Sequence, residues 1–136
     1  MDAALLDTDM LSEVLKRKDR RILAKARPYL AQHLRFAFSA ITAYEIIRGL
    51  RAKRATRQLT VFLNTISTSD VFPIALPVLM RAAELWSDAS AGGHPHDDAD
   101  LIIAATALEY GRVLVTGNTA HFAWIPGLRL EDWRQP

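Results

Sequence analysis

A helix, a tight turn and a buried strand follow one another in the second half of the chain, and this succession constrains the fold most strongly. Asp97 or Asp98 can cap a helix that continues to Tyr110, and Gly111 stands where a left-handed residue commonly ends a helix. Residues 112–116, Arg-Val-Leu-Val-Thr, form the clearest predicted strand. A buried apolar strand that follows a helix is typical of an α/β domain with a mostly parallel sheet.

The rest of the chain shows the same alternation of short apolar runs and amphipathic stretches. The first strand is predicted just before Asp7, and the following helix should have Thr8 or Asp9 as its N-cap. Further strands are predicted at residues 35–38, 71–75 and 128–130, and further helices at residues 20–33, 41–53, 57–68 and 77–90. Pro28 should kink or split its helix, and Pro73 restricts its strand to an edge or a short piece. With a length of 136 residues, we expect one α/β domain over residues 1–136.

Composition narrows the compartment and the chemistry. The chain has no cysteine, so disulfides and thiolate metal sites are excluded. Its N-terminus carries acids and no basic region, unlike a secretory signal. The longest apolar run, at residues 101–108, is too short to span a bilayer. We therefore expect a cytoplasmic protein without a membrane segment.

Two basic clusters, at residues 16–21 and 51–57, supply much of the positive charge of a chain whose formal net charge is +2. Such clusters attract phosphates without reading base sequence, although solvated helix faces have the same composition. The residues available for phosphate contacts are Lys16, Arg17, Arg20, Arg21, Arg51, Lys53, Arg54 and Arg57.

Three acids stand at informative places: Asp7 at the end of a predicted strand, Glu45 among apolar neighbours in a helix, and Asp100 in the first turn of a helix. Each acid also has an ordinary structural interpretation. Asp7 could cap a helix, Glu45 could pair with a nearby arginine, and Asp100 could interact favourably with the positive end of its helix dipole. If all three meet at the carboxyl end of the sheet, each carboxylate pair 5 Å apart repels by roughly 3 kcal/mol at an effective dielectric near 20. A divalent cation would relieve this repulsion, and oxygen ligands favour Mg²⁺ or Mn²⁺.

Four blocks of the sequence resemble the PIN-domain toxins of VapBC toxin–antitoxin pairs: LLDTDMLSEVLK at 5–16, SAITAYEIIRGL at 39–50, DADLIIAATALEYGRVLVTGNTAHF at 98–122 and IPGLRLEDW at 125–133. The resemblance implies a three-layer α/β/α fold with a mostly parallel central sheet and Mg²⁺- or Mn²⁺-dependent cleavage of RNA. It implies that the family's acidic, metal-binding positions fall on Asp7, Glu45 and Asp100. Its fourth polar position falls on Asn118, where many members have Asp, and its hydroxyl position falls on Thr116.

The same resemblance implies partners. It predicts a VapB-like antitoxin whose C-terminal segment blocks the acidic groove with an Arg or Lys, and a homodimer within a toxin–antitoxin hetero-oligomer. One of the two helices at 41–54 and 57–68 could form the dimer face, or the two helices could cover each other. Two positions depart from the family pattern: Asp9 replaces the usual Asn, and His121 stands where an acid commonly precedes Phe. We expect His121 to be a structural or surface residue.

Three other functions fit parts of the sequence. Asp-Thr-Asp at residues 7–9 is similar to the motif of haloacid-dehalogenase phosphatases, but the usual following Gly-Thr is absent. His-Pro-His-Asp-Asp at residues 94–98 is similar to a zinc-hydrolase signature without its final His. A PIN-like RNA-binding module without catalysis is the third, and the complete set of Asp7, Glu45 and Asp100 argues against it.

Overall fold

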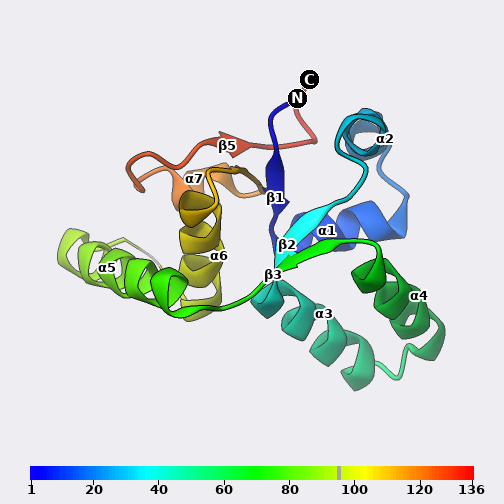
Figure 1. Ribbon diagram of the computed structural model, residues 1–136, viewed down its shortest axis with the longest axis horizontal. Helices are drawn as coiled ribbons and strands as arrows, with labels where there is room; N and C mark the ends of the chain where they lie inside the picture. Colours follow the sequence, from blue (N-terminus) through cyan, green and yellow to red (C-terminus); the bar gives the residue numbers. More distant parts are fainter. Residues whose placement is uncertain (95) are drawn as a thin grey trace.

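A computed structural model describes residues 1–94 and 96–136 of the chain. Its strands are β1 (Ala4–Leu6), β2 (Ala37–Ser39), β3 (Asp70–Phe72), β4 (Val113–Val115) and β5 (Leu130–Glu131). Its helices are α1 (Thr8–Lys16), α2 (Arg20–His33), α3 (Ala40–Ala52), α4 (Thr56–Ser67), α5 (Leu76–Gly92), α6 (Asp98–Glu109) and α7 (Thr119–Phe122). Figure 1 shows α1 to α4 on one side of the strands and α5 and α6 on the other.

Every strand pair in the described part of the chain is parallel, as the sequence predicts. β4 lies between β1 and β5, and β2 pairs with β3. β1 also contacts β2, so the two small sheets adjoin. In the three-stranded sheet Leu6 is level with Val115, which is level with Glu131. The residues that follow these three strands therefore come together at one edge.

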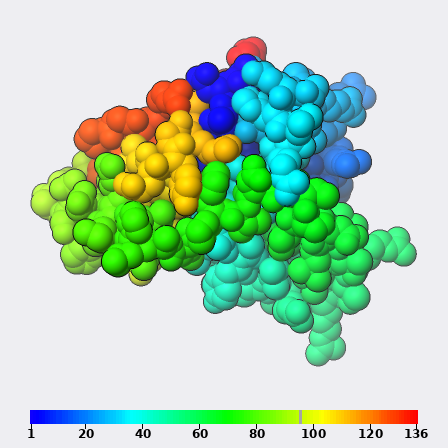
Figure 2. Space-filling view, in the orientation of Figure 1, coloured from blue at the N-terminus to red at the C-terminus, as the bar shows by residue number. Residues whose placement is uncertain are grey.

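Alternate residues of the strands face two separate cores. Leu6 and Val115 pack with apolar residues of α1, α2, α3 and α4, while their neighbours Leu5 and Leu114 pack with α5 and α6. This two-residue alternation is the pattern of a sheet covered on both faces. The expected three-layer α/β/α arrangement is thus confirmed. In the space-filling view, α3 and α4 project from the body of the molecule (Figure 2).

Capping explains where the helices begin and end. Asp97 caps α6, as one of the two predicted candidates. The cap of α1 is Asp7, so the prediction of Thr8 or Asp9 is wrong: the backbone of Asp7 is still extended, and its side chain accepts the Met10 N–H. Gly111 has a φ of 63°, the left-handed conformation expected for it after α6.

Several other predictions are corrected in detail. Pro28 does not split its helix, because Ile22 and Tyr29, on either side of it, are buried in the same core. β3 ends at Phe72, just before Pro73, and does not reach residue 75. The single-turn helix α7 was not predicted, since four residues carry no readable periodicity. None of the described helices is long and apolar enough to cross a membrane.

Candidate active site

Asp7 is the most buried acid at the carboxyl edge of the strands. It directly follows β1, is 8% exposed, and its Oδ1 accepts the Met10 N–H at 2.8 Å. Burial raises the pKa of Asp7 to about 6, although hydrogen bonds from the Thr116 hydroxyl and the Met10 N–H lower it. Asp7 therefore caps α1, as its ordinary interpretation predicts, and its carboxyl group is also shielded from solvent.

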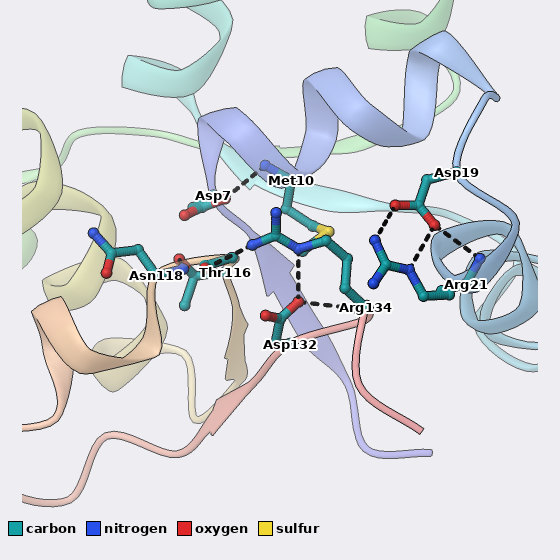
Figure 3. A network of polar contacts seen from close by, with 9 residues as sticks. Asp7, Met10, Asp19, Arg21, Thr116, Asn118, Asp132 and Arg134 are labelled. Atoms are coloured by element: carbon teal, nitrogen blue, oxygen red, sulfur yellow. Dashed lines mark hydrogen bonds and ion pairs between the residues drawn. The ribbon is translucent and has the colours of Figure 1, made fainter.

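Thr116 and Asn118 follow β4 at the same edge. Thr116 is fully buried, and its Oγ1 accepts the backbone N–H of Asn118 at 3.0 Å, which leaves the hydroxyl hydrogen for Asp7. Asn118 stands at the N-cap of α7 without making a side-chain capping bond. The close-up shows both side chains beside Asp7 (Figure 3). The structure thus brings three of the five predicted site residues together.

Glu45 reaches this group through a residue that the sequence analysis did not select. The Thr8 hydroxyl donates to Glu45 Oε1 at 2.7 Å and contacts the Thr42 hydroxyl at 3.1 Å. Of the two nearby arginines that could pair with Glu45 in its ordinary interpretation, Arg48 and Arg51, Arg48 lies 4.0 Å from Glu45 Oε2. Because Thr8 adjoins Asp7 in the chain, this hydrogen bond links Glu45 on α3 to the start of α1.

Asp100 stands in the first turn of α6, where Asp97 Oδ1 accepts its backbone N–H at 2.8 Å. Its Oδ2 lies 3.0 Å from Nε2 of His121 on α7. Burial raises the pKa of Asp100 to about 6, and the charge of Asp97 adds to this effect. His121 is thus in contact with a predicted site acid. The sequence analysis expected only a structural or surface role for His121 and did not predict this contact.

The three predicted metal ligands do not form one closed cluster. Among the residues that the structure describes, no group of three or more His, Asp or Glu side chains is spaced to hold a metal ion. Each acid instead has its own partner: Thr116 for Asp7, Thr8 for Glu45 and His121 for Asp100. The donors nevertheless fit a hard divalent cation, because they are oxygens and because two of the acids have pKa values raised by burial. A nearby cation would offset that cost of burial.

A basic side chain that the sequence analysis missed also lies here. Arg134, beyond β5, donates from Nη2 to the Gly117 carbonyl at 2.7 Å and from Nε to Asp132 Oδ1 at 3.3 Å. Its charge lowers the pKa of Asp7, opposing the larger effect of burial. The sequence offered little signal for Arg134, which stands a few residues beyond the last strand and outside both basic clusters.

A groove of about 650 Å³ runs between α1, α3 and α4, with Thr8 and Glu45 in its lining. Leu15, Ile46, Leu50 and Phe62 give it apolar walls. Three of the eight basic residues selected from the sequence line it, together with Lys18: Lys16, Lys53 and Arg57. The groove thus joins an apolar surface and a basic rim to one of the acids.

A comparison with protein families matches residues 4–126 to the PIN domain. The chain belongs to the PIN-domain family. It is 30% identical to a tRNA(fMet)-specific endonuclease VapC of Salmonella typhimurium over 95% of this chain and 96% of that protein. It is 32% identical to a VapC ribonuclease of Sinorhizobium fredii over 87% of this chain and 89% of that protein.

The solved structures agree with the sequence relatives. The crystal structure of DNA-bound VapBC from Salmonella typhimurium matches with a TM-score of 0.84 and 29% identity, over 98% of this chain and 99% of that one. Within the PIN family the chain is therefore a VapC ribonuclease, the toxin component of a type II toxin–antitoxin pair. PIN-domain nucleases are generally metal-dependent. The phosphatase, zinc-hydrolase and non-catalytic alternatives are therefore wrong. The zinc-like motif at residues 94–98 includes Pro95, which lies outside the described residues.

Proposed function

We propose that this chain hydrolyses RNA phosphodiester bonds with Mg²⁺ or Mn²⁺ held by Asp7, Asp100 and Glu45, directly or through water. The observation that carries the proposal is the buried carboxyl group of Asp7, hydrogen-bonded by Thr116 at the carboxyl edge of the strands. When bound, the ion supplies positive charge that activates a water molecule and stabilises the phosphate in the transition state. We expect this reaction in the cytoplasm, where RNA is abundant.

The residues of the chain then have separate tasks. Thr116 orients Asp7, and Thr8 orients Glu45. The Asn118 amide is available for a substrate or a water molecule, because it makes no capping bond. An amide adds no charge, so Asn118 contributes less to cation binding than a carboxylate would.

Calorimetric titration with Mn²⁺, followed by a cleavage assay on bacterial RNA, tests the proposal. We expect Asp100→Asn to weaken Mn²⁺ binding and to abolish cleavage while the thermal unfolding transition remains cooperative. Asp88→Asn is the matched control, because Asp88 is an exposed acid on α5. An Asp100→Asn variant that cleaves RNA at the wild-type rate would refute the proposed ligand set.

We propose further that a VapB-like antitoxin places a helical segment in the groove between α1, α3 and α4. The apolar walls suit the apolar face of a helix, and the basic rim suits acidic residues on its other face. An Arg or Lys of that segment would reach Glu45 and Asp7 and take the place of the cation's charge. Relatives support this idea, since solved structures include a toxin–antitoxin complex from Klebsiella pneumoniae.

A pair of substitutions on α4 tests this placement. Val61 lines the groove and is 54% exposed, whereas Thr60 is exposed outside the groove lining. Val61→Glu should weaken binding of a VapB-like antitoxin from the same genome, and Thr60→Glu should not. Equal binding by both variants would place the antitoxin elsewhere.

For the homodimer, we propose the outer face of α5 as the contact. The predicted alternative, in which one of the helices at 41–54 and 57–68 forms the dimer face, is weakened because α3 and α4 pack against each other. α5 instead carries large exposed apolar residues on one side: Leu76, Leu79, Met80 and Trp86. Such a face commonly marks a protein–protein contact.

A further inference from the structure

The last residues of the chain are anchored by Trp133. Its indole is 1% exposed and lies against Tyr29 and Phe36, with ring centroids 5.5 and 6.3 Å away. The next residue, Arg134, is fixed further by its backbone N–H, which donates to Asp132 Oδ1 at 2.9 Å. The Arg134 side chain therefore starts from a well-defined position beside the strand ends.

Its guanidinium group is also held at two points. Nε donates to Asp132 at 3.3 Å and Nη2 donates to the Gly117 carbonyl at 2.7 Å. The φ of Gly117 is not among the positive ones, but a Cβ there would meet the guanidinium of Arg134 and displace it. The guanidinium thus lies directly against the backbone of Gly117.

The remaining face of the guanidinium points toward the active-site residues. Figure 3 shows the group near Asp7 and Thr116, with Asn118 beyond them. Of its five N–H bonds, two are used in the described contacts, and the side chain is 37% exposed. No ion pair joins Arg134 to Asp7 among the described residues, because Asp132 is its carboxylate partner. A fixed, partly open guanidinium fork beside metal-binding carboxylates is suited to a phosphate group.

We propose that Arg134 binds the scissile phosphate of RNA, in a position set by Asp132 and Gly117. This inference rests on the proposed function, because the phosphate must lie between the metal-binding acids and the guanidinium. The arginine would hold one non-bridging oxygen and stabilise the charge that grows on the phosphate during attack by water. Because Asp132 and Gly117 already restrict the side chain, little conformational entropy is lost on binding.

Arg134→Gln tests the inference, and Arg129→Gln is the matched control. Arg129 makes the same kind of contacts, to Asp2 Oδ2 at 3.0 Å and to the Gly111 carbonyl at 2.9 Å, but at the opposite end of the strands. Binding of a fluorescein-labelled single-stranded RNA is measured in EDTA, where no cleavage occurs, over a range of salt concentrations. Cleavage of total bacterial transfer RNA is measured at saturating Mn²⁺.

We expect Arg134→Gln to weaken RNA binding by about 10- to 100-fold and to reduce the salt slope by about 0.7, with no loss of Mn²⁺ affinity. Arg134→Lys should keep the salt slope but not the cleavage rate, because it lacks the fork. Gly117→Ala should likewise keep the slope and lower kcat/KM, since it displaces the guanidinium without removing its charge.

Two results would overturn the inference. If Arg134→Gln and Arg129→Gln behave alike in RNA binding and cleavage, Arg134 only fastens the end of the chain, and a lowered Tm would be its main effect. If Arg134→Gln binds Mn²⁺ more tightly and RNA as well as the wild type, the arginine is a counter-ion of the acids. Wild-type protein that neither binds nor cuts RNA would refute the proposed function and this inference together.

Discussion

Replacing Asp7 by Asn should stabilise the metal-free protein while it removes activity. Burial raises the pKa of Asp7 from 3.8 to about 6. A difference of this size corresponds to about 3 kcal/mol between the ionised and the neutral carboxyl group. Asn keeps the shape and an oxygen that can accept the Met10 N–H, so the cap survives the change. Allowing for a weaker bond with Thr116, we expect a net gain of about 1–3 kcal/mol near neutral pH.

The gain in stability from Asp7→Asn must increase as the pH rises. The folded state binds the Asp7 proton more tightly than the unfolded chain does, because its folded pKa is the higher one. The cost of ionising Asp7 is therefore absent below pH 3.8, grows between pH 3.8 and about 6, and is constant above that. The stability of Asp7→Asn relative to the wild type should rise over this same window.

Urea denaturation in EDTA between pH 3.5 and 8 measures the effect, and Asp19→Asn gives a control of opposite sign. Asp19 caps α2, and its hydrogen bond with the Arg21 side chain lowers its pKa to about 2. Its folded pKa is depressed, so its contribution is present above pH 3.8 and is lost as the pH falls through about 2. Asp19→Asn should thus be the less stable variant at neutral pH.

Activity should change in the opposite sense to stability. Asp7→Asn removes a proposed metal ligand, so RNA cleavage at saturating Mn²⁺ should fall by at least about 100-fold, the upper range for residues that only support a ligand. A stability gain that is the same at pH 4 and pH 8 would refute the desolvation argument. A loss of stability at pH 8 would show that the hydrogen bonds of the carboxylate outweigh its burial.

Three further predictions concern other parts of the chain. His121→Ala should weaken Mn²⁺ binding by about tenfold in calorimetry, because it removes the partner of Asp100; unchanged affinity would make that contact incidental. Met80→Glu should convert a dimer into a monomer in light scattering, and a dimer that persists would place the contact away from α5. Trp133→Ala should lower the free energy of unfolding by about 3–5 kcal/mol. Trp133→Phe should cost less, because no described partner bonds the indole N–H.

Local patterns were sufficient for most of the fold. The apolar run before Asp7 and the run 112–116 lie in strands because they are short and buried on both faces, and the structure keeps both within a residue or two. The cap of α1 was misplaced, because Asp7, Thr8 and Asp9 are all good capping residues and only the end of β1 selects among them. α7 has too few residues to produce a pattern.

The contacts between the residues of the candidate site were harder to predict than the residues themselves. Thr8 meets Glu45 across 37 positions of the chain, and Arg134 meets Gly117 across 17. Such pairs depend on how α1 packs on α3 and on the register of β4 and β5, and neither is written in a local pattern. The same limit applies to the basic clusters. Composition identified their residues, but only the packing of α1, α3 and α4 brings Lys16, Lys53 and Arg57 to one groove.

Position after a strand identifies part of this site without any motif, although it does not select Glu45 and Asp100, which lie in helices. Asp7, Thr116 and Asp132 each come directly after a strand of the three-stranded sheet. The register places the ends of those strands level, so the three polar side chains must share an edge whatever their identity. Two of them, Asp7 and Thr116, are proposed site residues, and Asp132 contacts the guanidinium of Arg134. Once the strands are assigned, the rule selects Asp132, whose contact with Arg134 becomes visible only in the structure.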